Sequence, residues 1–390
     1  RWVRSRFGRP PHRAEVHRPR PVSRLLELRD WLISSTERLG RLSAALLQKE
    51  SWDLALVCFT ATHRGGHKLW SETGVTGGAT PSEHREFAGA LHAVYRSIDA
   101  EVGRLVEVSG APDPVLAFSL HGMGSNTSRA DLMERMMANV LSPDAGGRSQ
   151  SSPAAEGRSG SSAGAASRAW VARVRDGVPA GWRSEIKRRL PNALADRLTS
   201  LRHTGALEWS TTRAFPLVAD LQGYIRVNLR GRESAGIVEP GSEYDEVCAR
   251  LVEGLSTFVD ADSNEPVVEA VRRIDELYPD GPRRSMLPDL VVRWAPVEAA
   301  HSREIRSPRF GSIACPTPGL DPGGRSGNHR PEGFLLATGT VAPTALPAPR
   351  HILDLAPTVF ELLGVERPPR MPGTPLWTRP VECARQDSNL

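Results

Sequence analysis

Cysteine is scarce in this chain, and its four cysteines lie far apart. Cys58, Cys248, Cys315 and Cys383 form no CxxC pair, so the sequence predicts neither a zinc knuckle nor a disulfide framework. No apolar run approaches the roughly 20 residues that a membrane span needs, and no signal peptide opens the chain. We therefore expect a cytoplasmic protein without membrane contact.

Negative charge is almost missing from the start of the chain. The first 24 residues hold eight arginines and a single acid, Glu15, whereas the whole chain of 390 residues has a net charge of only +5. A basic arm can bind nucleic acid, but no aromatic platform for bases accompanies these charges. We therefore expect a disordered basic arm at 1–22 and rank nucleic-acid binding last.

Large apolar residues are scarce between 142 and 168, where Ser, Ala, Gly, Arg and Pro predominate. Such a segment buries too little surface to order itself, so it predicts a disordered insertion. We expect the chain to divide into the basic arm 1–22, a first core part 23–141, the insertion 142–168, a cap of helices and strands 169–285, a second core part 286–376 and an unstructured tail 377–390.

The apolar spacing elsewhere predicts an α/β protein. Helical periodicity over 23–50 and 81–108 alternates with strand-like apolar runs at 52–60 and 115–120. This βαβ rhythm favours a three-layer core, in which a mixed, mostly parallel sheet lies between helices. Further strands are expected at 224–229, 289–294 and 334–339, and further helices at 244–259 and 354–363.

Four histidines stand near the edges of apolar runs. His63 and His67 follow the run at 52–60, His121 precedes a glycine after the run at 115–120, and His329 stands in Gly-Asn-His-Arg-Pro. Loops at strand ends can bring such residues together, and neutral imidazoles suit zinc, manganese or iron better than magnesium or calcium. We predict a zinc or manganese site with one or two ions at these four histidines.

The segments around these histidines resemble the alkaline phosphatase superfamily, in its branch of type I phosphodiesterases, nucleotide pyrophosphatases and predicted phosphohydrolases or phosphomutases. The resemblance runs over about 22–376. Its motifs are the histidine segments, Gly-Tyr-Ile-Arg-Val-Asn-Leu-Arg-Gly-Arg-Glu at 223–233, Leu-Pro-Asp-Leu-Val-Val at 287–292, and Asp-Leu-Ala-Pro-Thr-Val at 354–359.

The resemblance implies a two-metal site at the carboxyl ends of the sheet strands and hydrolysis of a small-molecule phosphate or sulfate ester through a Thr or Ser nucleophile. His67 and His329 match two ligands of that site, and His121 matches the histidine of an Asp-His-Gly motif. His63 replaces an Asp, and Leu120 replaces the Asp that should precede His121. The N-terminal strands of the sheet, with the nucleophile, have no counterpart, so we expect them to be missing from this sequence.

Two interpretations of these departures stay open. The chain is either a fragment of a metal-dependent ester hydrolase with an altered metal site, or a catalytically inactive binding protein on the same fold. For anion contacts the candidates are Arg330, Asn228 and Arg232, because a guanidinium matches the geometry of a phosphate. The sequence does not predict the oligomeric state.

Overall fold

The computed structural model describes residues 2–8, 19–110, 114–142, 207–217, 222–321, 323–339 and 350–377. The chain forms two compact units. Among the described residues, the first combines those up to 125 with those from 323 onward, and the second those between 126 and 321. The described part of the cap expected at 169–285 begins at 207 and falls within the second unit. The insertion expected at 142–168 and the tail from 378 lie outside the described residues, apart from Ser142.

Helices of the first unit pack around one apolar core. They are α2 (Val22–Lys49), α3 (Ala61–Lys68), α4 (Pro81–Ala88) and α5 (Ala90–Ser109), with a short 3-10 turn η1 (Glu72–Gly74). Helix α1 (Trp2–Phe7) precedes them and has no buried residue. Buried side chains from α2, α3, α4 and α5 meet in this core, among them Leu25, Leu32, Ala61, Phe87 and Val94. The helix expected at 23–50 is confirmed as α2, and the basic arm contains the helix α1 where disorder was expected.

The helix expected at 81–108 is divided at Gly89 into α4 and α5. Its beginning is fixed by a capping box, in which Thr80 accepts from the amide of Glu83 and the Glu83 carboxylate accepts from the amide of Thr80. The capping residue is thus Thr80, directly before the helix begins at Pro81. Such caps satisfy the free amides of the first turn.

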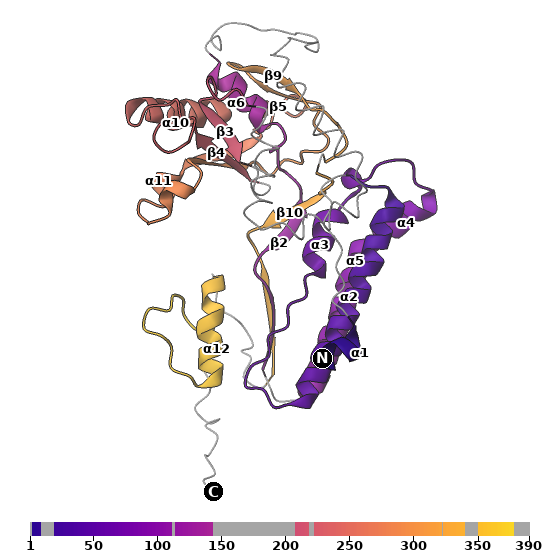
Figure 1. The fold of residues 1–390 in the computed structure, drawn as a ribbon. Helices are drawn as coiled ribbons and strands as arrows, with labels where there is room; N and C mark the ends of the chain where they lie inside the picture. The colour runs from indigo at the N-terminus through magenta and orange to yellow at the C-terminus, as the bar shows by residue number, and fades with distance from the viewer. Residues whose placement is uncertain are drawn as a thin grey trace. The chain divides into compact units, whose positions relative to one another are not determined.

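A two-stranded ribbon completes the part of the first unit that carries the histidines. Strand β1 (Val115–Ser119) pairs antiparallel with β11 (Phe334–Thr338), and β2 (Gly122–Ser125) pairs antiparallel with β10 (Gly327–Arg330). The same two stretches of chain therefore meet twice, on either side of an interruption at 120–121 and 331–333. Figure 1 shows β2 and β10 beside α3.

The C-terminal helix α12 (Leu355–Leu363) follows the 3-10 turn η3 (Ile352–Asp354), as the sequence predicts. Asp354 accepts hydrogen bonds from the amides of His351 and Thr374 at 3.0 Å each. Thr358 accepts from the amide of Leu376 at 2.8 Å. These bonds tie the segment after α12 back to its first turn.

The second unit is built on two antiparallel sheets. The four-stranded sheet has the order β3-β4-β7-β6, and the three-stranded sheet the order β5-β8-β9. The strands are β3 (Ala214–Leu217), β4 (Gly223–Val227), β5 (Val259–Asp260), β6 (Val268–Arg273), β7 (Leu290–Trp294), β8 (Glu304–Ser307) and β9 (Gly311–Ala314). The helices are α6 (Met133–Leu141), α10 (Ser242–Leu255), α11 (Ile274–Leu277) and the 3-10 turn η2 (Arg284–Met286).

A separate apolar core holds this second unit together. Met136 from α6, Leu251 from α10, and Ile225 and Leu290 from the central strands are each fully buried in it. The strands expected at 224–229 and 289–294 and the helix expected at 244–259 are confirmed as β4, β7 and α10. The expected first core part extends to 141, but the structure assigns α6 to the second unit.

The expectation of a mixed α/β protein is confirmed, but the mostly parallel three-layer sheet is wrong for the described residues. All strand pairs of the four sheets there are antiparallel, and parallel pairing is confined to isolated bridges. The βαβ rhythm misled because β1 pairs with a strand more than 200 residues later in the chain. The run at 52–60 forms no strand, and Leu54 and Leu56 are exposed.

None of the helices in the described ranges combines the length and the apolar character that crossing a membrane requires.

Candidate metal centre

Helix α3 presents His63 and His67 on one face. The two residues are four positions apart, which places their side chains one above the other on a helix. Their ring centroids are 4.9 Å apart. Both residues lie within the eight-residue helix Ala61–Lys68. His63 is exposed to solvent, whereas only 2% of His67 is exposed.

The ribbon supplies His121 and His329. His121 stands directly before β2, at the interruption between β1 and β2, and His329 lies within β10 opposite Met123. The ring centroids of His121 and His329 are 4.1 Å apart. The antiparallel register of β2 and β10 thus joins two histidines that are more than 200 residues apart in the sequence.

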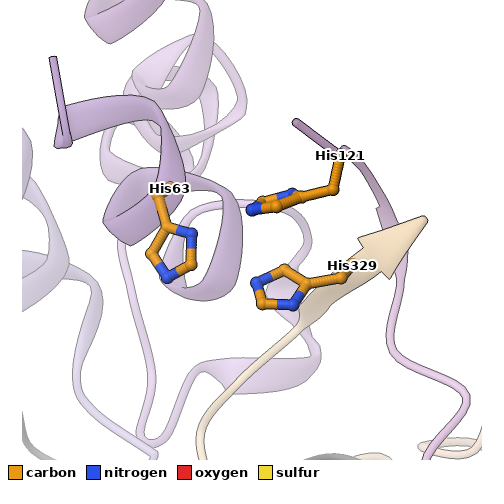
Figure 2. A group of neighbouring side chains, drawn as sticks. All are labelled: His63, His121 and His329. Carbon is orange, nitrogen blue, oxygen red and sulfur yellow. The ribbon is translucent and has the colours of Figure 1, made fainter. Parts of the chain in front are cut away.

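The four imidazoles converge, with His329 in contact with each of the others. Its ring centroid lies 5.0 Å from that of His63 and 4.7 Å from that of His67. One ligand nitrogen each from His63, His121 and His329 lie within 4.8 Å of one another. Figure 2 shows these three rings with nitrogen atoms turned towards the space between them. We call the four residues the histidine cluster.

Backbone carbonyls orient two rings of the histidine cluster. The Nδ1 of His67 is 2.8 Å from the carbonyl oxygen of Gly327, and the Nδ1 of His121 is 3.1 Å from that of Gly122. Because a carbonyl only accepts, each Nδ1 must carry the proton, and each Nε2 then carries a lone pair in place of a proton. Metal-binding histidines are typically held by such bonds from the second ring nitrogen.

His67 is kept neutral by its surroundings. Burial lowers the pKa of His67 to about 4, and the charge of Arg325 acts in the same direction, although the hydrogen bond to Gly327 opposes them. The Nε2 of His67 lies 3.1 Å from the Nε2 of His329. A neutral imidazole is the form that binds a metal ion, so His67 is in the ligand state at neutral pH.

Two glycines let α3 approach β10 closely enough for these contacts. A Cβ atom on Gly327 would collide with the carbonyl oxygen of Gly66, and a Cβ on Gly66 would collide with the Met123 side chain. The packing of α3 against β10 therefore depends on the absence of a side chain at Gly327, whereas at Gly66 the flexible Met123 side chain would have to shift. Sequence reasoning missed this role and the two carbonyl acceptors, although each of the four histidines has a glycine within three positions.

The donor set fits a transition-metal ion. Imidazole nitrogens suit zinc, copper, iron and nickel, whereas magnesium and calcium need oxygen ligands. Zinc–imidazole bonds of about 2.0–2.1 Å at a tetrahedral angle separate two ligand nitrogens by about 3.3 Å. The 3.1 Å between the Nε2 atoms of His67 and His329 is close to that spacing. The residues present therefore fit a zinc ion.

Arg330 does not turn towards the histidine cluster. Successive side chains of a strand point to opposite faces, so Arg330 lies on the other face of β10 from His329. Its side chain lies against Gly124, and its Nη2 donates to the carbonyl oxygen of Ser125 at 3.2 Å. Arg330 therefore fastens β10 to β2, and its predicted contact with an anion stays a prediction.

Asn228 and Arg232 belong to the second unit, and both form hydrogen bonds within it. The Asn228 amide is fully buried and donates to the carbonyl oxygens of Thr212 and Ala235 at 2.9 Å each. Arg232 donates to both carboxylate oxygens of Asp289, at 2.8 and 2.7 Å. These contacts give both side chains a structural role, and substrate contact by them stays a prediction.

Comparison of the chain with protein-family models, with curated proteins and with solved structures yields no match.

Proposed function

We propose that this chain is a metal-dependent hydrolase of phosphoric or sulfuric esters, of the alkaline phosphatase type that its motifs resemble. The observation that carries the proposal is the convergence of His63, His67, His121 and His329 from three separate segments. The same four residues were selected from the sequence by their motifs alone. Histidines that are far apart in the sequence rarely contact one another by chance.

The residues of the histidine cluster would hold the ion, and Gly327 and Gly122 would keep the Nδ1 protons away from it. A bound zinc ion would supply Lewis acidity and positive charge for the oxygens of an ester. The first charged neighbour acting on His67 is also a cation, Arg325. Positive charge in the ligands' surroundings favours an anionic substrate over a neutral one.

A second candidate is a metal-binding protein without catalysis. Leu120 stands where the resemblance implies a metal-binding Asp, and its side chain is 60% exposed. A leucine cannot bind a metal ion, so this position contributes nothing to a second ion. This observation favours the loss of the two-metal reaction in this lineage.

The proposal is tested by hydrolysis of three probes: nitrophenyl phosphate, bis-nitrophenyl phosphate and nitrophenyl sulfate. Because the Thr or Ser nucleophile of the resemblance has no counterpart here, water activated by the ion would have to attack the ester. We then expect the zinc-loaded chain to hydrolyse at least one of the probes more than tenfold faster than the chelator-treated chain. His329→Ala should lose this activity, and His84→Ala should keep it, because His84 lies outside the histidine cluster and contacts Glu72. A chain that binds zinc yet hydrolyses none of the probes would establish the second candidate instead.

A further inference from the structure

The histidine cluster contains imidazoles and no carboxylate. Within the described ranges, the group formed by His63, His121 and His329 is the one place where three or more His, Cys, Asp or Glu ligand atoms come within 4.8 Å of one another. We infer that residues 1–390 hold a single transition-metal ion through imidazole nitrogens alone, instead of the two ions that the resemblance implies. This inference rests on the metal site of the proposed function.

His67 belongs to the same ion as the other three histidines. Its Nε2 is 3.1 Å from the Nε2 of His329, and His329 is also part of the group with His63 and His121. A second ion beside His67 would have to take the same nitrogen of His329, which has one lone pair to give. The contact with His329 therefore places His67 beside the group of three histidines.

Charge also opposes a second ion. Paired ions in hydrolases lie about 3.5–4 Å apart, and carboxylates between them offset the repulsion of four positive charges. Here the ligands are imidazoles, and Leu120 stands at the position of one expected carboxylate. Nothing in the histidine cluster compensates for a second divalent cation.

One side of the histidine cluster is open to solvent. His63 is exposed, and His121 and His329 are half-buried, whereas His67 lies deep on the other side. An ion can therefore enter past His63 without unfolding of α3. Substitution of the exposed His63 also leaves the buried packing of α3 unchanged, which makes it a suitable test position.

The inference is tested by titration of the chain with cobalt(II), followed by its visible absorption and by native mass spectrometry. We expect one cobalt per chain with the strong bands of a tetrahedral nitrogen site. His63→Ala and His121→Ala should each weaken binding at least tenfold, and His329→Ala should abolish it. His84→Ala should bind as the unchanged chain does, and circular dichroism shows whether each variant is folded.

A stoichiometry of two cobalt ions per chain would overturn the inference, as would unchanged binding by a folded His121→Ala variant. The outcome is separable from that of the hydrolysis assay. One bound ion without hydrolysis would leave the inference standing and overturn the proposed function. Two bound ions with hydrolysis would overturn the inference and support the proposed function.

Discussion

At the residue scale, some side-chain roles could be predicted from the sequence and others could not. The four histidines could be found from the sequence because each stands near a glycine at the end of an apolar run. Arg232 could not be interpreted in this way, because a guanidinium binds a phosphate and a carboxylate equally well. Its partner, Asp289, is known only from the fold.

Asp260 is the residue from which we expect a pH-dependent stability. Burial alone would raise the pKa of Asp260, but hydrogen bonds from the Ser302 hydroxyl and from the amides of Ser263 and Asp262, with the charge of Arg129, outweigh burial and lower it. Arg129 is 2% exposed and lies 3.5 Å from the Asp260 carboxylate. The ionised carboxylate therefore stabilises the folded second unit.

A carboxylate with a lowered pKa contributes its full stabilisation above the unfolded-state pKa of about 3.9. That contribution is lost as the pH falls through the lower folded-state pKa. Asp260→Asn should cost about 3 kcal/mol at pH 7, since it removes the carboxylate that faces the buried Arg129. It should cost less at pH 3, which lies below the unfolded-state pKa. Urea unfolding at both pH values measures this, and an equal loss at both would contradict it.

At the element scale, the position of α3 against β10 decides whether the histidine cluster forms. Gly327→Ala places a methyl group against the carbonyl oxygen of Gly66, so α3 must move away from β10. We expect zinc affinity to fall at least tenfold, in the range seen when groups that orient metal ligands are changed. Isothermal titration with zinc measures this.

The matched control for Gly327→Ala is Gly78→Ala, because a Cβ at Gly78 has no atom within 4 Å. Gly78→Ala should bind zinc as the unchanged chain does. If Gly327→Ala also bound zinc unchanged, the close contact between α3 and β10 would not be what positions His67.

Helices and strands could be predicted from the sequence where the local sequence determines them. They could not be predicted where pairing with a distant strand determines them. Helix α2 follows from its apolar periodicity, as does the helical stretch at 81–108 that forms α4 and α5. The run at 52–60 has strand composition, yet no strand pairs with it in the described part of the chain. Strand direction was missed for the same reason, since β11 as the partner of β1 could not be deduced from local pattern.

At the scale of the whole molecule, two units with separate apolar cores share one chain. The histidine cluster lies entirely within the first unit, so a bound ion stabilises that unit directly. At a free zinc concentration 100 times the dissociation constant, the stabilisation is about 2.7 kcal/mol, or roughly 10 °C in the melting temperature of a unit of this size.

We therefore expect zinc to raise one of two calorimetric transitions and to leave the other in place. His329→Ala should show no shift with zinc. Equal shifts of both transitions would contradict the location of the metal site in the first unit alone. A single transition that zinc does not move would contradict both zinc binding and the separate unfolding of the two units.

The most direct test of the central claim, that the histidine cluster binds a transition-metal ion, is zinc-edge X-ray absorption on the zinc-loaded chain. We predict a shell of nitrogen atoms at about 2.0–2.1 Å with the outer-shell scattering of imidazole rings, and no sulfur at about 2.3 Å. The signal should be lost from His329→Ala after removal of free zinc. Sulfur ligands, or the oxygen-only shell of a hydrated ion, would contradict the account.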